Sequence, residues 1–284
     1  MIFQDVTQVI GKTPLVRLNR LAPQAELLGK LEYLAPGGSV KDRAALSMIL
    51  DGEARGLLKP GGTVVEASGG NTGVGLAMVA AVRGYRCIIV VPETTSQDKI
   101  RVLRALGAET VLARTDVDAE HAEGFIGRAA ALARELGAFA PDQFGNPANA
   151  AAHYRATAPE IVADCDGKLD AFVCCVGSHG TLSGIGRYLR EHVPHVHIAA
   201  VVTQAKSRIE GVSDEHHAEK FTPDAILTIA DDVALRTQQD LVRREGILAG
   251  FSSGLAVAAA LQLTERFRRV VVILPDTARN YLSL

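Results

Sequence analysis

The sequence predicts an α/β fold of two three-layer αβα domains with mostly parallel sheets. Short β-branched runs alternate with longer helical patterns along most of the 284 residues. Several short runs, such as 86–91 and 170–176, are apolar almost throughout instead of alternating with polar residues. This is typical of parallel strands that are covered by helices on both faces. The strand–helix units are too many for one small sheet, so we expect two domains.

The expected elements follow one another in regular order. They are a helix from Lys41 to about Arg55, a strand at 63–66, a helix at 71–83, a strand at 86–91, a helix at 97–106, a strand at 109–112, a helix at 119–136, a strand at 170–176, a helix at 181–190, a strand at 198–202, a helix at 254–267 and a strand at 270–274. The segment 137–149 is rich in Pro, Gly and Asn and predicts a break between domains.

The composition excludes several classes of function. The net charge is −2 and no block of like charges is present, so we expect neither a nucleic-acid partner nor binding to an anionic membrane. The N-terminus has no signal-peptide pattern, and no stretch reaches about 18 apolar residues. Cys87, Cys165, Cys174 and Cys175 have no metal-ligand spacing. We therefore expect a cytoplasmic protein with reduced cysteines and no metal site.

Four glycine-rich loops lie at the starts of predicted helices, where ligands bind in open α/β sheets. The first, 36–43 (PGGSVKDR), has a glycine pair before Lys41. A lysine in this position is most often a solvated side chain. The alternative is a lysine that bonds covalently to a cofactor, and this interpretation needs support from the other loops.

The other three loops favour anionic groups to different degrees. In 67–73 (ASGGNTG), glycines and a helix N-terminus suit a carboxylate or phosphate, although a tight turn with an Asn cap is an alternative. The loop 177–181 (GSHGT) offers two hydroxyl groups and suits a phosphate monoester, and it is not a Walker loop. The serines of 250–254 (GFSSG) are most often helix caps. Together, a lysine, a phosphate loop and a carboxylate loop suit a cofactor with an aldehyde and a phosphate that acts on an amino acid.

These motifs resemble the cysteine synthase and cystathionine β-synthase family of pyridoxal 5′-phosphate (PLP) enzymes, which have the tryptophan synthase β-like fold (PLP fold type II). The similarity extends over nearly the whole chain. Its landmarks are IGKTPLVRL at 10–18, PGGSVKDR at 36–43, GNTGVGLAM at 70–78, NPANAAAHY at 146–154 and LPD at 274–276.

The resemblance implies a role for each loop. Lys41 would hold PLP as a Schiff base and act as the catalytic base. The remaining cofactor-binding residues would be Asn71 at the 3′-oxygen, Gly177, Ser178, His179, Gly180 and Thr181 at the phosphate, and Ser252 at the pyridine nitrogen. The substrate-binding residues would be Ser68, Gly69, Asn71, Thr72 and Gln143. No metal ligand is implied.

The resemblance also implies the domain organisation. A smaller, mobile N-terminal domain, 35–145, would bind the substrate carboxylate. A larger domain, formed by 1–34 and 146–284, would bind the PLP phosphate. The partners would be small amino-acid substrates and a second copy of the chain in a homodimer.

The sequence departs from the family pattern in three places, two of which concern the substrates and one the phosphate loop. Gly69 stands where the family usually has a serine, so one hydroxyl group is missing. His179 replaces a glycine of the phosphate loop. Its side chain could make a charge-sensitive contact near the phosphate or point to solvent, and we favour the solvent-facing orientation. The segment 204–223 is short and polar where relatives have a longer glycine-bearing loop.

We therefore expect β-replacement on L-serine or an O-activated L-serine through an aminoacrylate, with a thiol or sulfide nucleophile. A neutral Ser252 at the pyridine nitrogen favours β-elimination and replacement over aminotransfer. Alternatives are a serine or threonine deaminase, a cysteine desulfhydrase, or a specialised biosynthetic enzyme with a non-sulfur nucleophile. A non-catalytic regulatory relative is disfavoured because Lys41, Asn71 and Ser252 are all present.

Overall fold

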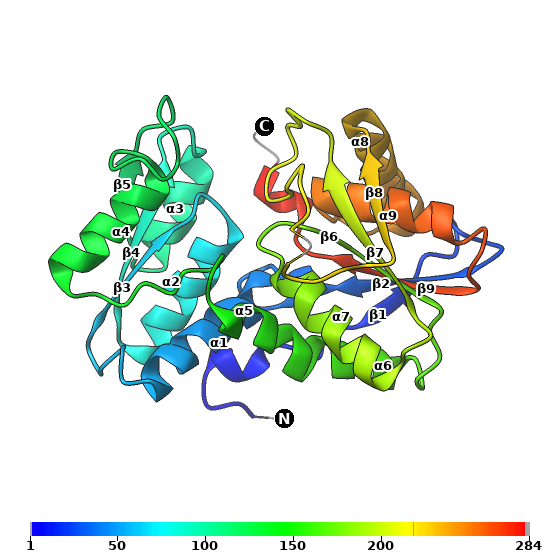
Figure 1. Ribbon diagram of the computed structural model, residues 1–284, viewed down its shortest axis with the longest axis horizontal. Helices are drawn as coiled ribbons and strands as arrows, with labels where there is room; N and C mark the ends of the chain where they lie inside the picture. Colours follow the sequence, from blue (N-terminus) through cyan, green and yellow to red (C-terminus); the bar gives the residue numbers. More distant parts are fainter. Residues whose placement is uncertain (1, 218, 282–284) are drawn as a thin grey trace. The chain divides into compact units, whose positions relative to one another are not determined.

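The structure is a computed structural model that describes residues 2–217 and 219–281 (Figure 1). The chain forms two compact units. Unit 1 comprises the N-terminal residues to Ile10 together with Lys41–Asn149, and unit 2 comprises Gly11–Val40 and the described chain from Ala150 onward. Each unit contains one sheet with helices on both faces, so the predicted αβα class with mostly parallel sheets is confirmed.

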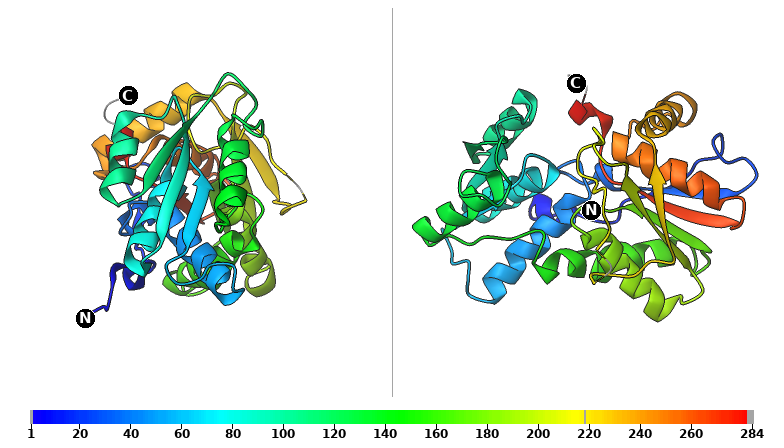
Figure 2. Two further views of the ribbon diagram at one scale, coloured as in Figure 1. Left: turned by 90° about the vertical axis from the view of Figure 1, so that its left-hand side faces the viewer. Right: turned by 45° about the horizontal axis from the view of Figure 1, so that its top comes forward.

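Unit 1 is built on three parallel strands, β3 (Thr63–Ala67), β4 (Arg86–Pro92) and β5 (Glu109–Ala113). One face of this sheet packs on α1, α2 and α3, and the other packs on α4, as the left view of Figure 2 shows. The bounds of these helices are α1 Lys41–Ala54, α2 Asn71–Arg83, α3 Gln97–Ala105 and α4 Phe125–Leu136. Successive residues of β3 and β4 point to opposite faces of the sheet, and each face is covered by a hydrophobic core. Both faces therefore need apolar side chains, which explains why these strands are apolar almost throughout.

Unit 2 contains six strands in the order β1-β2-β9-β6-β7-β8. Their bounds are β1 Leu15–Arg17, β2 Glu26–Leu31, β6 Ala171–Cys175, β7 His197–Thr203, β8 Ala225–Ile229 and β9 Arg269–Leu274. All neighbours pair in parallel except β1 with β2. The helices α8 (Asp231–Asp240) and α9 (Phe251–Leu263) cover one face, and α6 (Ala158–Asp164) and α7 (Gly180–His192) cover the other (Figure 2, right).

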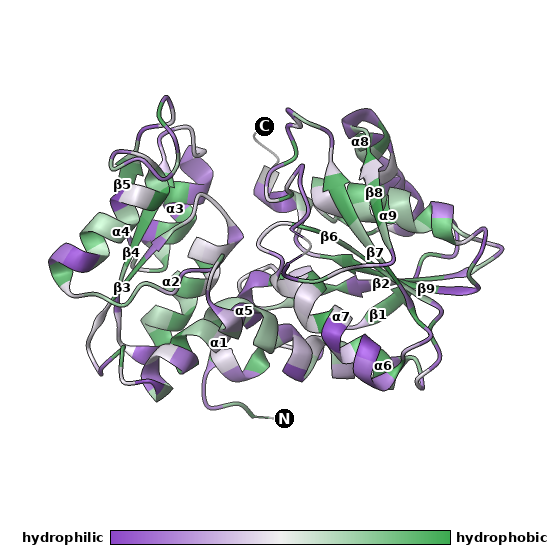
Figure 3. Ribbon diagram, viewed as in Figure 1, coloured by the Kyte–Doolittle hydropathy of each residue, from purple (hydrophilic) through white to green (hydrophobic). Residues whose placement is uncertain are grey.

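Short helices complete the chain. They are η1 Val6–Val9, η2 Glu32–Leu34, α5 Pro147–Ala152, the π-helical turns η3 His153–Thr157 and η4 Leu241–Glu245, and η5 Ala278–Tyr281. In both units the strands are hydrophobic and the polar residues lie mainly on helix surfaces and loops (Figure 3). No helix in the described part of the chain is long and apolar enough to cross a membrane.

Two helices begin at positions other than those predicted. We expected a helix over 119–136, but α4 begins at Phe125 because the segment before it forms a turn. A side chain at Gly124 would lie 2.1 Å from the carbonyl oxygen of Asp118, so this turn tolerates only glycine. The helix expected over 254–267 begins earlier, at Phe251, and ends at Leu263. Thr264 follows its last turn and donates its hydroxyl hydrogen to the Leu261 carbonyl at 2.6 Å.

A close crossing of α1 and α2 fixes the backbone of Lys41. Lys41 is the first residue of α1, and Gly75 lies in the second turn of α2. A Cβ atom at Gly75 would stand 3.0 Å from the Cβ of Ala45 and 3.1 Å from the carbonyl oxygen of Lys41. Because Gly75 has no side chain, the start of α1 can pack directly on α2.

Replacing Gly75 tests this crossing. Gly75→Ala should reduce the free energy of unfolding by about 1–3 kcal/mol, because a methyl group would overpack the contact. The double variant Ala45→Gly/Gly75→Ala should recover only part of the loss, since the Lys41 carbonyl belongs to the backbone. Urea denaturation measures both effects. Wild-type stability of Gly75→Ala would contradict the close crossing.

Candidate active site

The loop that leads from β3 into α2 is organised by Ser68. The buried Ser68 hydroxyl oxygen accepts hydrogen bonds from the backbone N–H of Gly70 at 3.2 Å and of Gly73 at 3.1 Å. It thus satisfies amide groups that the first turn of α2 would leave unpaired. We predicted from the sequence that Ser68 binds the substrate. The structure shows that its side chain also stabilises the conformation of this loop.

Thr72 and Gln143 meet beside this loop although they lie far apart in the sequence. The Thr72 hydroxyl donates to Oε1 of Gln143 at 2.6 Å, and Nε2 of Gln143 donates to the carbonyl of Ala67 at 3.4 Å. The Asn149 amide in turn donates to the Gln143 carbonyl at 2.8 Å. Asn71 begins α2 in the same place. The structure therefore brings the predicted substrate-binding residues of unit 1 together at one helix N-terminus.

Gly69 is crowded by a neighbour that the sequence did not indicate. A Cβ atom at Gly69 would lie 3.0 Å from the hydroxyl oxygen of Thr95 and 3.1 Å from Cδ of Pro92. The space of the family's serine side chain is therefore partly filled by the loop that follows β4. Position 69 lacks the serine hydroxyl of the family, but the Thr95 hydroxyl lies next to this position.

A substitution at Gly69 should reveal this crowding. Gly69→Ser is expected to reduce stability by about 1–3 kcal/mol, because the added atoms must displace Thr95 and Pro92. Gly69→Ser/Thr95→Ala should recover part of the loss. Thermal unfolding of the three proteins, with Thr95→Ala alone as the control, measures the coupling. Simple additivity of the two substitutions would contradict the contact.

Glu66 is a buried carboxyl group directly beneath the substrate loop. Its Oε1 accepts from the N–H of Ala67 at 2.9 Å, and its Oε2 accepts from the N–H of Gln143 at 3.3 Å. Burial raises the pKa of Glu66 to about 7, and these two backbone hydrogen bonds only partly offset that effect. Nothing in the sequence pattern distinguished Glu66 from an ordinary strand residue.

The raised pKa of Glu66 predicts a pH dependence of stability. The unfolded chain loses this proton near pH 4.5, whereas the folded chain keeps it until about pH 7. The group therefore destabilises the fold progressively as the pH rises between these values, by at most about 3 kcal/mol. Glu66→Gln should lack this fall in stability. It should also carry a pH-independent loss, because an amide nitrogen replaces one acceptor oxygen.

Urea denaturation between pH 4.5 and 8 measures this difference. Glu135→Gln, which changes an exposed carboxyl of α4, is the matched control and should follow the wild type. Parallel stability curves for Glu66→Gln and the wild type would show that Glu66 titrates normally in the folded protein.

In unit 2, the predicted phosphate loop lies between β6 and the first turn of α7. Ser178 and His179 are buried, with 8% and 3% of their surfaces exposed. The residue at the N-cap of α7, His179, makes no side-chain hydrogen bond to the helix. The amide groups that open this helix are thus left to backbone, solvent or an anionic ligand.

Thr181 lies beside His153, a residue for which we predicted no role from the sequence. The Thr181 hydroxyl lies 3.4 Å from Nε2 of the fully buried His153, whose Nδ1 lies 3.0 Å from the hydroxyl of Thr157. His153 belongs to the NPANAAAHY motif. That motif was informative about the family, but only the folded chain shows which of its residues reaches the phosphate loop.

His179 differs from its predicted orientation. We expected a solvent-facing side chain, but the ring is buried, and its Nε2 accepts the backbone N–H of His217 at 3.0 Å. The residue has a positive φ of 67°, a conformation that glycine adopts easily and other residues adopt rarely. The pKa of His179 is lowered to about 4, mainly by burial and in addition by the nearby Lys220, His216 and His217.

Ser252 lies in the first turn of α9, close to the end of β6. The thiol of Cys175, the last residue of β6, donates to the Ser252 carbonyl at 3.2 Å. Burial raises the pKa of Cys175 to about 12, and burial also raises the pKa of Cys87 to about 12. Neither thiol is therefore activated as a nucleophile. The Ser252 side chain and the phosphate loop share the carboxyl-terminal edge of the unit 2 sheet.

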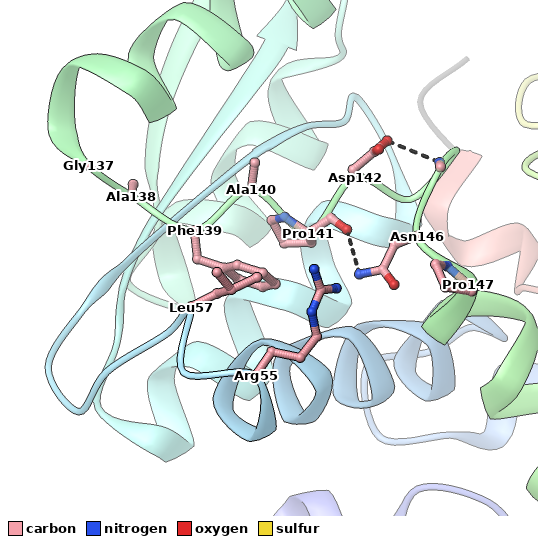
Figure 4. A pocket seen from close by; sticks show the side chains of 11 residues that line it. Arg55, Leu57, Gly137, Ala138, Phe139, Ala140, Pro141, Asp142, Asn146 and Pro147 are labelled. Carbon is pink, nitrogen blue, oxygen red and sulfur yellow. Dashed lines mark hydrogen bonds between the residues drawn. The ribbon is translucent and has the colours of Figure 1, made fainter.

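A separate hollow of about 570 Å³ lies in unit 1 (Figure 4). It is lined by Arg55, Leu57 and the segment 137–142, together with 145–147. Arg55 points toward Pro141 and Asn146 in this view. None of the predicted site residues lines the hollow, so we assign it no part in catalysis.

The comparisons with known proteins agree with this arrangement. The family model for pyridoxal-phosphate dependent enzymes matches residues 6–276. The chain belongs to this family. The resemblance to cysteine synthases and cystathionine β-synthases is confirmed by relatives that match 98–99% of the chain.

Two relatives and one solved structure illustrate the range of activities in this group. The chain is 43% identical to cystathionine beta-synthase of Apis mellifera over 99% of its length, and it spans 61% of that protein. It is 41% identical to cysteine synthase of Staphylococcus aureus, with 98% of this chain and 95% of the relative covered. The crystal structure of O-ureido-L-serine synthase is 39% identical, with a TM-score of 0.93 over 100% of this chain and 95% of that one.

The side chains present fit PLP chemically. The start of α7 has no side-chain cap and carries the buried Ser178, which suits a phosphate group. The hydroxyl side chain of Ser252 suits a ring nitrogen, and Lys41 offers a primary amine for an aldehyde. Around Gly70 a Cβ atom would meet nothing within 4 Å, so the start of α2 has open space for a ligand.

Proposed function

We propose that this enzyme carries out PLP-dependent β-replacement on L-serine or an O-activated L-serine, with a thiol or sulfide as nucleophile. The observation that carries this proposal is the placement of Lys41 and the anion-binding loop on two helices that cross at Gly75. The crossing holds an amine and a carboxylate-binding site in one unit. An amino acid bound by its carboxylate would present its Cα to such an amine.

Under this proposal the residues of unit 1 handle the substrate. Thr72 and Gln143 hold each other in place and, with Ser68, Gly69 and Asn71, bind the substrate carboxylate at the start of α2. PLP, when bound, supplies an aldehyde for the amino group and a ring that withdraws electrons from Cα. The Lys41 amine removes the Cα proton and returns it after the new bond at Cβ has formed.

The residues of unit 2 bind the cofactor. Gly177, Ser178, Gly180 and Thr181 hold the phosphate at the N-terminus of α7, and His153 orients the Thr181 hydroxyl. The Ser252 hydroxyl would donate a hydrogen bond to the ring nitrogen and so leave that nitrogen without a proton or a formal charge. A neutral nitrogen makes the ring a weaker electron sink, which favours loss of a β-substituent over aminotransfer.

The same proposal covers the organisation of the protein. Unit 1, which contains most of the predicted domain 35–145, is mobile and binds the substrate carboxylate, whereas unit 2, which contains most of 1–34 and 146–284, binds the phosphate. The functional form is a cytoplasmic homodimer. The four cysteines are free, which agrees with a reducing compartment.

A non-sulfur nucleophile is a second candidate, and the surroundings of Gly69 favour it. Thr95 and Pro92 reshape the substrate loop at the position of the family's serine. The structure of O-ureido-L-serine synthase, which matches this chain closely, shows that the fold accommodates a specialised product. A panel of sulfide, homocysteine and hydroxylamine-type nucleophiles, read by mass spectrometry of the products, distinguishes the two candidates.

Substitution of Lys41 tests the proposal. Lys41→Ala should abolish the visible absorbance of the bound cofactor and reduce turnover of O-acetyl-L-serine or O-phospho-L-serine by about 10²–10⁴-fold, because the amine that moves the Cα proton is gone. Lys59→Ala removes an exposed lysine of the same unit and should behave as the wild type. Retention of the absorbance without Lys41 would refute its assignment. Accumulation of pyruvate with every nucleophile would indicate a deaminase instead.

A further inference from the structure

The described residues between β7 and β8, 204–217 and 219–224, form the β7–β8 loop, which folds back onto the phosphate loop of unit 2. The N–H of Ser213 donates to the carbonyl of Val176 at 2.7 Å, and the N–H of Thr203 donates to the carbonyl of Ser213 at 3.0 Å. Ser213 therefore joins the carboxyl ends of β6 and β7. The β7–β8 loop is therefore hydrogen-bonded to the ends of two strands of the sheet.

A second contact lies one residue further along the phosphate loop. A Cβ atom at Gly177 would stand 2.5 Å from the carbonyl oxygen of Gly211. The two backbones can approach this closely only because position 177 has no side chain. Glycine at 177 thus serves the packing of the β7–β8 loop as well as the approach of a phosphate group.

His179 makes the third contact and reaches furthest along the loop. Its Nε2 accepts the N–H of His217 at 3.0 Å, and its ring lies 5.2 Å from the ring of His216 and 5.1 Å from that of His217, measured between centroids. A nitrogen that accepts a hydrogen bond carries no proton, so the neutral ring must hold its proton on Nδ1. The backbone of Gly177 also forms a hydrogen bond with this ring.

The surroundings keep the His179 ring in this neutral form. Burial, Lys220 and the two neighbouring histidines together lower its pKa to about 4, and burial contributes most. The cluster is not a metal centre, because no group of three or more His, Cys, Asp or Glu in the described ranges is arranged to hold an ion. A buried neutral imidazole with one fixed acceptor is suited to position a loop.

We propose that His179 is a positioning residue that fastens the β7–β8 loop to the phosphate loop and thereby slows release of the cofactor phosphate. This inference rests on the proposed role of 177–181 as the phosphate site. The left-handed backbone at His179 is costly for histidine, whereas glycine and asparagine adopt it more readily, and the hydrogen bond to His217 offsets that cost. Because coupling between two sites is reciprocal, a bound phosphate group should also order the β7–β8 loop.

Two substitutions separate the contacts of the ring. In His179→Asn the side-chain amide reaches only the position of Nδ1, and asparagine tolerates a positive φ. In His179→Gln the amide oxygen reaches the position of Nε2 and can accept the His217 N–H. The matched control is Arg208→Ala, which changes an exposed side chain of the same loop. It keeps the hydrogen bond from the backbone N–H of residue 208 to the Asp231 carboxylate at 3.0 Å.

The experiment is hydrogen exchange of the holoenzyme together with the rate at which PLP is lost to an apoenzyme trap. His179→Asn should accelerate exchange at the Ser213 and His217 amides and PLP release, each by about 2- to 10-fold. His179→Gln should restore part of both, and Arg208→Ala should match the wild type. Equal rates in His179→Asn and the wild type would overturn the inference.

The wild-type chain alone provides a second test if the variants fail to fold. Adding PLP to the apoenzyme should protect the Ser213 and His217 amides from exchange, and nitrogen NMR should show the His179 proton on Nδ1. Unchanged exchange at these amides on PLP binding would overturn the role of the loop. Failure of the wild-type chain to bind PLP at all would instead refute the proposed function.

Discussion

Parallel pairing of the strands decides where the chemistry of this protein can lie. Strands that run in parallel bring all their carboxyl ends to one edge, and a helix must begin there to lead the chain back. The loops before α2 and α7 satisfy this condition. The start of α9 follows another helix, but it lies beside the end of β6, where the Cys175 thiol donates to the Ser252 carbonyl. Each combines the positive end of a helix with glycines and hydroxyl side chains, which is the chemistry needed to hold anions.

Close backbone contacts then set the geometry of each loop. Gly75 lets the first turn of α1 rest on α2, and Gly177 lets the β7–β8 loop rest on the phosphate loop. Side chains add the finer positioning: Gln143 holds Thr72, His153 holds Thr181 and His179 holds His217. Because these contacts lie within closely packed interiors, a small change in side-chain volume at one of them should shift the positions of the reactive groups.

The sequence was sufficient where structure is local. The helix 71–83 was predicted with its observed bounds, since the pattern ends at Gly84, which adopts the left-handed conformation that ends helices. The short β1 and the antiparallel pairing with β2 were not predicted, because three residues carry too weak a period. The hydrogen bond between Thr72 and Gln143 could not be predicted, since the two residues are 71 positions apart in the sequence. The buried state of Glu66 and the inward turn of His179 likewise depend on tertiary packing and leave no mark in a local pattern.

The central claim is that Lys41 is the residue that bonds to PLP. The most direct measurement is borohydride reduction of the purified holoenzyme, followed by proteolysis and mass spectrometry of the labelled peptide. We expect one pyridoxyl adduct, located on the peptide that contains Lys41. A stoichiometric adduct on another lysine, such as Lys30 or Lys220, or the absence of any adduct from protein that retains PLP, would contradict it.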